Sequence, residues 1–369
     1  MKMQNKVSFG RWEAVTLLIN LISTKLFLYF ARMTVEDAGT AGWIMTIYIC
    51  LVTAIVYMAL ISLFKKFDGK DILDIAEYTG GKPLKIFTGL LITSVLFYST
   101  TAVLREFSED MKVVSLPSSP LSYIIIFFII GVVAGSYLGI EAILRYHAII
   151  VPIIATGYIF ILLGAIPQMD LTNILPILGN GLNSIFMKGF FRISVFGELM
   201  IIFLLPPFLG SYKNVRSVGY ISIAFSSVFL ISGSLTYILT YPYPSGLESF
   251  LPIYQMARLI NLGRFFQRIE ALFVFIWAMA AFIYLTATFY FMVYTFSKSA
   301  GLKYMRPMIF PFAILVFSAA FVPKNLMEVI NIETQYFGKM AWIATFIFTF
   351  IILAAANLRK KSEKEKLDR

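Results

Sequence analysis

Residues 20–30, NLISTKLFLYF, place a lysine, Lys25, within a stretch that is otherwise apolar enough to cross a membrane. A helix rises about 1.5 Å per residue, so this lysine lies near the bilayer centre if the segment begins at residue 11. An ionisable group at that depth costs several kcal/mol unless it is paired or hydrated. Asn20, Ser23 and Thr24 precede it. Such a cluster of locally hydrogen-bonding side chains is typical of a helix break that lines a wet cavity.

The composition of the whole chain indicates a membrane protein. Of its 369 residues 59% are hydrophobic and 14% are charged, against about 45–50% and about 25% in soluble domains. The net charge of +11 is attributed to loops that face anionic lipid, and no nucleic-acid partner is expected. A single cysteine, Cys50, excludes an internal disulfide, and a single histidine, His147, leaves no Cys/His metal cluster. We expect no metal and no cofactor.

Ten segments are long and apolar enough to span the bilayer. Their predicted bounds are 11–31, 39–64, 84–105, 121–139, 146–166, 189–208, 218–240, 269–296, 307–322 and 340–358. Residues 65–83 combine charge with apolar residues at helical spacing and predict a short amphipathic helix. Lysine and arginine are concentrated in the loops and ends on one side of this arrangement, which predicts that both termini are cytoplasmic.

The sixth predicted segment, FFRISVFGELMIIFLLPPF (190–208), contains a second deep ionisable residue, Glu198. Gly197 before it and Pro206–Pro207 after it weaken the helix at this point. The two anomalous segments are therefore the first and the sixth of ten. Five-plus-five inverted repeats predict this spacing, with matching helices broken at the midplane around a shared site. We predict one transmembrane domain over residues 1–358, with repeats at about 11–166 and 189–358, and a charged tail at 359–369.

The chemistry of this site has several open alternatives. A half-helix N-terminus presents free N–H groups to an anion, so amides near Thr24, Lys25 and Leu26 are candidates to hold a carboxylate. Lys25 either reinforces that positive charge or occupies the position of a coupling cation. Glu198 either receives an ammonium group or a proton, or forms an ion pair with Lys25.

Other polar residues within the segments are weaker candidates. In the third and eighth segments, hydroxyl side chains form polar faces. These hydroxyl groups either contribute to the site or bond back to the carbonyl groups of their own helix. The side chains are Tyr98, Ser99, Thr100, Thr101, Tyr284, Thr286 and Thr288. At the start of the fifth segment, Glu141, Arg145 and His147 predict a structural ion pair or a proton relay. No GxSxG, P-loop or HExxH motif is present, so we expect no enzymatic activity.

Four stretches of the sequence carry a family resemblance. They are STKLFLYFARMTVEDAGTAGWIMTIY (23–48), GIEAILRY (139–146), FGELMIIFLLPPF (196–208) and RLINLGRFFQRIEALFVFIW (258–277). Their order and spacing resemble the permease-like B subunits of the spore germinant receptors of endospore-forming bacteria, over nearly the whole chain. This family belongs to the amino acid/polyamine/organocation transporter superfamily, whose members share the LeuT-like core of ten helices in inverted repeats.

The resemblance implies a protein of the spore inner membrane. It would bind a germinant such as an amino acid and trigger ion release and germination together with a membrane-bound A subunit and a C-subunit lipoprotein. The ligand site of the superfamily maps here onto Ser23, Thr24, Lys25, Phe196, Gly197, Glu198, Tyr98 and Trp277. One departure is that the superfamily usually has a glycine-rich break in the first helix, whereas ISTKLF contains no glycine.

The leading functional interpretation is a receptor subunit that converts ligand occupancy into a signal through its partners. The alternative is a proton-coupled amino acid transporter that uses Glu198 or Lys25. A subunit of a ligand-gated ion pathway is a third possibility, which overlaps with the first.

Overall fold

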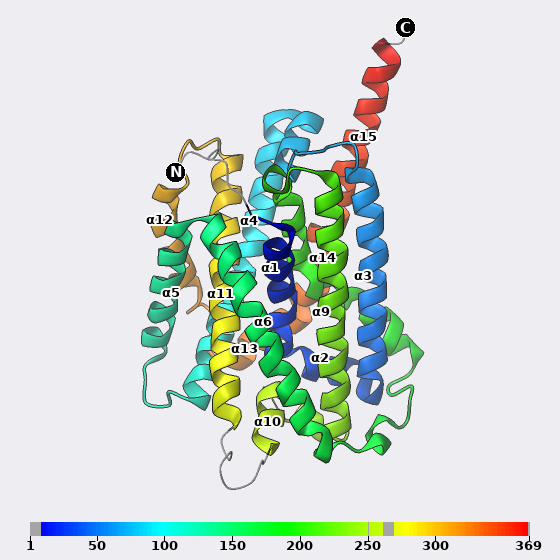
Figure 1. The fold of residues 1–369 in the computed structure, drawn as a ribbon, viewed down its shortest axis with the longest axis vertical. Coiled ribbons are helices and arrows are strands. Elements are labelled where there is room, and N and C mark those ends of the chain that lie inside the picture. Colours follow the sequence, from blue (N-terminus) through cyan, green and yellow to red (C-terminus); the bar gives the residue numbers. More distant parts are fainter. Residues whose placement is uncertain (1–8, 250, 261–268, 368–369) are drawn as a thin grey trace.

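A computed structural model describes residues 9–249, 251–260 and 269–367. Residues 261–268, part of the fourth of the quoted stretches, therefore lie outside the described residues. The helices form a bundle, and both ends of the described chain lie at the same end of it (Figure 1). We call this the termini end. The opposite end, where α10 (Pro252–Leu259) lies, is the far end.

Seven described helices are long and apolar enough to cross a membrane, which makes the chain an integral membrane protein. They are α3 (Gly42–Phe64), α4 (Ile72–Val114), α5 (Leu121–Leu138), α6 (Ile140–Ala165), α9 (Tyr212–Thr240), α11 (Ile269–Ser299) and the run that comprises α13 (Leu326–Asn331), α14 (Gly338–Trp342) and α15 (Phe348–Leu367). A shorter apolar helix, α12 (Arg306–Ala319), lies beside them. Two interrupted segments complete the predicted set of ten.

The first interrupted segment begins with α1 (Arg11–Ser23) and continues as a 3-10 turn over Thr24–Phe27. The hydroxyl of Thr24 donates to the carbonyl of Asn20 at 2.7 Å, a local hydrogen bond that competes with the regular helical pattern. At Leu28 the backbone leaves the helical region (φ −96°, ψ −112°) before α2 (Phe30–Ala38) starts. The chain therefore leaves the helix at Leu28, three residues after Lys25, without a glycine.

The second interrupted segment is the sixth of the ten. It comprises a π-helical turn over Ser184–Lys188, α7 (Gly189–Phe191), a 3-10 helix over Arg192–Leu204 and α8 (Pro206–Leu209). Runs of 3-10 helix longer than about four residues are uncommon and often mark a hinge. All thirteen residues of this 3-10 helix are buried, and its backbone is non-helical at Phe196.

Two predicted boundaries were wrong. The third segment does not end at residue 105, because α4 continues to Val114 and buries Glu106 and Asp110. The last segment does not begin at residue 340, because its helical run starts at Leu326 and buries Glu333. Both errors have one cause: charged residues lower the average hydropathy of a window, although these particular charges lie inside the bundle.

The predicted amphipathic helix at 65–83 is the first part of α4. Asp71 caps it and forms a reciprocal capping box with Asp74. The helix then bends at Gly80 and Gly81, where Gly81 has a φ of +72° that favours glycine. This bend lets one continuous element run along the surface and then cross the bundle.

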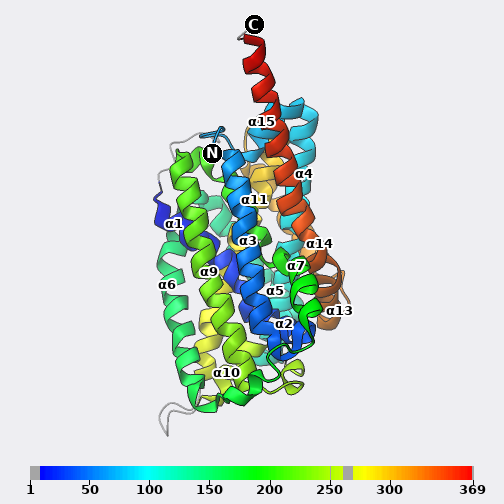
Figure 2. The ribbon, with the colours of Figure 1, turned by 90° about the vertical axis from the view of Figure 1, so that its right-hand side faces the viewer.

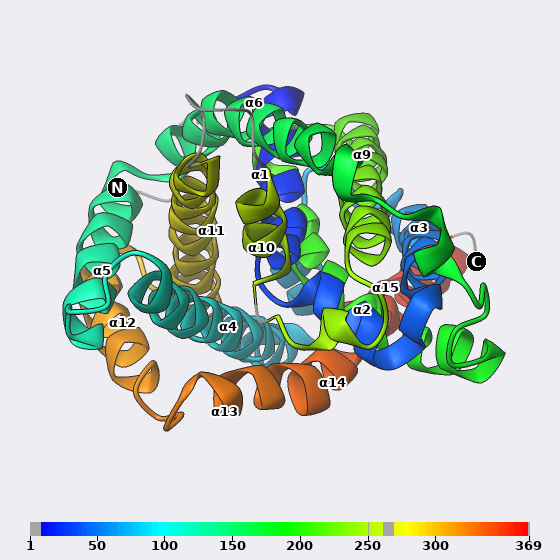
Figure 3. The ribbon, with the colours of Figure 1, turned by 90° about the horizontal axis from the view of Figure 1, so that it is seen from below.

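Helix α1 and the 3-10 helix over Arg192–Leu204 lie in the interior of the bundle. Every residue of α1 from Ala14 to Ser23 is buried, as expected for a helix that is apolar on all sides. It contacts α6, α9, α11 and the 3-10 helix of the sixth segment. Figure 3 shows this central position from the far end, and Figure 2 shows α3 and α9 side by side at the periphery.

Candidate functional site

An ion pair joins the two interrupted segments at their breaks. The ammonium group of Lys25 lies 2.7 Å from Oε2 of Glu198 and donates to the carbonyl of Val195 at 3.2 Å. The two charged side chains are 6% and 3% exposed. Burial of both charges is costly, so this pair depends on close geometry and on hydrogen bonds to the remaining lone pairs.

Tyr284 on α11 supplies the next hydrogen bond. Its hydroxyl donates to Oε1 of Glu198 at 2.8 Å, so both carboxylate oxygens have a partner. Thr286 and Thr288 donate to the carbonyls of Phe282 and Tyr284 on their own helix. This is the alternative to a role in the site that the sequence analysis gave for these hydroxyl groups. Of these three hydroxyl groups, that of Tyr284 reaches the ion pair.

The space around the ion pair is closed. Lys25, Ser99, Ser194 and Glu198 are among the residues that line it, and it has no room for a water molecule. Gly197 also lines this space, and a Cβ atom there would meet only Thr345 at an ordinary contact distance of 3.7 Å. The structure therefore shows an occluded conformation of the site.

The residues beside Lys25 differ in their bonding. The backbone N–H of Thr24 donates to the carbonyl of Asn20 and is not free for a ligand. Ser23 Oγ, in contrast, is buried and has no hydrogen-bond partner among the described residues. Phe196 is fully buried at the non-helical position of the 3-10 helix, next to Gly197 and Glu198. Ser23 is thus the one of these side chains with unused hydrogen-bonding capacity.

The structure does not bring all predicted site residues together. Trp277 packs between Phe107 and Phe273, with ring centroids 4.6 and 5.8 Å away, and does not line the closed space. Tyr284, about two turns further along the same helix, occupies the place beside Glu198 instead. Tyr98 stacks on Phe337, which lines the closed space, with ring centroids 3.8 Å apart.

A second polar centre adjoins the ion pair and was missed by the sequence analysis. Its main residue is Glu333, in a π-helical turn over Ile332–Phe337, which accepts a hydrogen bond from Tyr29 at 2.7 Å. Tyr98 stacks on Phe337, about one turn after Glu333, and Phe337 lines the space around the ion pair. The second centre therefore adjoins the first through Phe337.

A further ion pair joins the two interrupted segments nearer the far end of the bundle. Arg192, at the start of the 3-10 helix, pairs with Asp37 of α2 at 2.6 Å and donates to the carbonyl of Thr334. One arginine thus connects both interrupted segments to the π-helical turn that carries Glu333.

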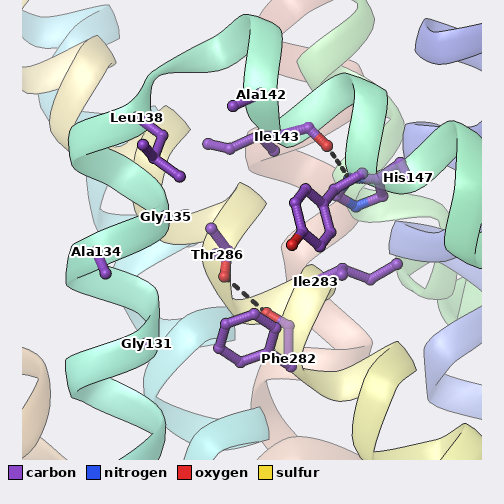
Figure 4. A pocket seen from close by; sticks show the side chains of 11 residues that line it. Gly131, Ala134, Gly135, Leu138, Ala142, Ile143, His147, Phe282, Ile283 and Thr286 are labelled. Carbon is purple, nitrogen blue, oxygen red and sulfur yellow. Dashed lines mark hydrogen bonds between the residues drawn. The ribbon is translucent and has the colours of Figure 1, made fainter.

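A separate cavity of about 240 Å³ lies between α5, α6 and α11. Small residues and Phe282 line it, and His147 lies at its edge with Nδ1 2.8 Å from the carbonyl of Ile143 (Figure 4). Arg145 pairs with Glu141 at 2.5 Å, and His147 is not part of this pair. The ion pair is exposed at the surface, and the cavity is distinct from the site at Lys25.

Solved structures with the same fold define the class of protein. The chain superposes on Mhp1, a nucleobase-cation-symport-1 family transporter that was solved in a closed conformation with bromovinylhydantoin bound. The TM-score is 0.66 and the sequence identity is 10%, and the match covers 94% of this chain and 78% of Mhp1. It also matches a Na⁺-coupled sialic acid symporter (TM-score 0.64, 12% identity, 94% and 82% coverage) and MhsT in complex with L-phenylalanine (0.64, 13%, 96% and 99%). The chain is an integral membrane protein of the LeuT-type transporter fold, so the predicted fold class is confirmed.

Sequence comparison then identifies the family. The family model described as spore germination protein matches residues 11–329, and the chain belongs to this family. It is 21% identical over 343 residues to spore germination protein KB of Bacillus subtilis (strain 168), covering 89% of this chain and 90% of that protein. It is 22% identical over 202 residues to spore germination protein B2 of the same strain, a match that spans about half of each protein (55% in both cases). The predicted resemblance is confirmed.

Proposed function

We propose that the chain is the permease-like subunit of a spore nutrient germinant receptor and binds a small zwitterionic germinant, an amino acid, at the Lys25–Glu198 pair. The single observation that supports this proposal most is the ion pair itself, buried between two interrupted segments. An ammonium and a carboxylate held side by side are complementary to the carboxylate and the ammonium of an amino acid. The site thus offers one opposite charge to each end of such a ligand.

Replacement of the Lys25–Glu198 contact by contacts with the charged groups of the ligand explains how binding would produce a signal. In the occluded conformation Lys25 and Glu198 neutralise each other in a space without room for water. An amino acid that enters must separate them, and its own charged groups compensate each one. A ligand shifts a conformational equilibrium by as much as it binds one state better than the other. Occupancy therefore favours a conformation with the pair separated.

The fold neighbours support the ligand class. MhsT was solved with L-phenylalanine and has the same fold over 96% of this chain. The family membership supports the setting: the spore inner membrane, both termini cytoplasmic, and partnership with a germinant receptor A subunit and a C-subunit lipoprotein. The residues we assign to the ligand are Ser23, Thr24, Lys25, Phe196, Gly197 and Glu198, with Tyr98 as an outer neighbour. Trp277, which does not line the closed space, is not assigned to the ligand. We keep the predicted division into repeats at about 11–166 and 189–358 and a tail at 359–369.

A test of this proposal is reconstitution of the full chain in liposomes with labelled amino acids. We expect saturable binding that is lost in Glu198→Gln, without concentrative uptake. Concentrative uptake driven by a pH gradient would instead establish the alternative, a proton-coupled amino acid transporter. No binding of any amino acid, in a preparation shown to be folded, would contradict both functions.

A further inference from the structure

Three buried carboxyl groups lie outside the Lys25–Glu198 pair. Glu106 and Asp110 are one turn apart on the far-end part of α4 and are 2% and 3% exposed. Glu333, on the facing π-helical turn, is 8% exposed. Buried carboxyl groups at membrane depth are rare and mark ion or proton pathways.

These groups lie along two facing elements that lead to the ion pair. Tyr98, about two turns before Glu106 on α4, stacks on Phe337 with ring centroids 3.8 Å apart. Phe337 is about one turn after Glu333 and lines the space around Lys25 and Glu198. The series therefore extends from α4 to the residues that enclose the ion pair.

No described cation forms an ion pair with these three carboxyl groups. Lys25 pairs with Glu198, and Arg192 with Asp37. Arg105, the nearest basic residue in the chain, pairs with Glu109 at 2.7 Å and donates to the carbonyl of Ala320. Three uncompensated buried carboxylates would each cost several kcal/mol. Neutral, protonated carboxyl groups remove that cost.

One atom of the series has unused hydrogen-bonding capacity. Oε1 of Glu106 is buried and has no partner among the described residues. This oxygen is therefore available for a hydrogen bond to a neighbouring hydroxyl group or a water molecule, as a proton-transfer group requires.

We propose that Asp110, Glu106 and Glu333 form a proton-transfer route between the far end of the bundle and Glu198. In each step the carboxylic O–H of one residue gives its proton to a carboxylate oxygen of the next, directly or through a tyrosine hydroxyl or a water molecule, and the charge moves in the opposite direction. A proton that reaches Glu198 neutralises its carboxylate and removes the partner of Lys25. Protonation therefore separates the pair, and loss of the proton restores the carboxylate that the ligand ammonium needs.

This route rests on the proposed function, because it ends at the proposed ligand site, and it adds a regulation of that site by protons. Carboxyl and hydroxyl groups against the series are those of Tyr29 at Glu333, Tyr98 and Glu109 on α4, and Tyr284 and Glu198 at its inner end. The cations near it are Lys25, Arg105 on α4, and Arg192, which donates to the carbonyl of Thr334 next to Glu333. Each of these three cations is already paired with another carboxylate.

The test uses the full chain in liposomes that contain a pH-sensitive dye, with an imposed pH gradient and a potassium diffusion potential. We expect proton flux that falls by about a hundredfold in Glu106→Gln, as is typical for loss of a positioned proton-transfer group. Asp110→Asn and Glu333→Gln should have the same effect. Glu109→Gln is the matched control, because this residue lies on the same helix between Glu106 and Asp110 but is 19% exposed and paired with Arg105.

A second measurement does not depend on flux. The infrared absorption of protonated carboxyl groups in the purified protein should lose intensity in Glu106→Gln and keep it in Glu109→Gln. Equal flux in the wild type and Glu106→Gln, no flux in the wild type, or an unchanged carboxyl band would each overturn the route. Binding of labelled amino acids in the same liposomes tests the ligand site separately, so failure of the route and failure of the proposed function are distinguishable.

Discussion

At the scale of single residues, the Lys25–Glu198 pair has the largest expected effect. Removal of one partner leaves an uncompensated buried charge, which costs about 3–5 kcal/mol. We expect Lys25→Met and Glu198→Gln each to abolish the germinant response and to lower the thermal stability of the purified protein. The double variant should be less destabilised than the sum of the single effects, because it leaves no isolated charge.

Thermal unfolding in detergent measures these stabilities, and a germination assay measures the response. Additive destabilisation in the double variant would show that the two residues act independently. A normal germinant response in both single variants would remove them from the site.

Tyr284 allows a finer test of the same carboxylate. Tyr284→Phe removes the donor to Oε1 of Glu198 and leaves a buried acceptor without its partner, at a cost of about 1–3 kcal/mol. The control is Thr288→Val, since the hydroxyl of Thr288 bonds to its own helix and the substitution keeps the shape of the side chain. A loss of stability in Thr288→Val as large as in Tyr284→Phe would contradict this assignment.

The sequence predicted some site residues and not others for a physical reason. Lys25 and Glu198 stand out because each is a single charge in an apolar segment. Glu106 and Glu333 do not, because other charged residues surround them and the hydropathy average excludes the whole stretch. The spacing of Glu106 and Asp110, one helical turn apart, was the available signal. Trp277 and Tyr284 lie about two turns apart on nearly the same face of α11. Which of the two lies level with the pair depends on the position of the helix along its axis, and hydropathy does not encode that position.

At the scale of elements, the bend in α4 is the most direct test of local structure. Gly81 has φ +72° and ψ −167°, a conformation that costs other residues about 1–3 kcal/mol. We expect Gly81→Ala to lower the melting temperature in detergent. Gly246→Ala is the control, because Gly246 does not have a positive φ and its Cβ would meet atoms at 3.5 Å or more. If Gly81→Ala and Gly246→Ala had the same melting temperature, the result would show that an alanine side chain does not strain the bend.

The elements themselves were mostly predictable. Ten crossing segments and the two breaks follow from hydropathy, helix-weakening residues and their positions in the chain. The type of helix at the second break did not follow, since a 3-10 helix over Arg192–Leu204 depends on its neighbours and not on local propensity.

At the scale of the whole molecule, the closed site predicts a pattern of chemical accessibility. The chain has one cysteine, Cys50, so a Cys50→Ser background allows single cysteines to be introduced. We expect Ser194→Cys to be unreactive toward a charged thiol reagent in the absence of ligand, because Ser194 lines the occluded space. Ser118→Cys, at an exposed loop position, is the reactive control. Equal labelling rates at both positions would show that the site is open.

One consequence of the 3-10 helix over Arg192–Leu204 is mechanical. A 3-10 helix rises about 2.0 Å per residue and an α-helix about 1.5 Å, so thirteen residues would shorten by roughly 6 Å on rewinding. Glu198 lies in the middle of this helix, where separation from Lys25 would release it. Rewinding of this segment into an α-helix after the pair separates would therefore change the distance between its ends, which links the state of the ion pair to the positions of the neighbouring helices.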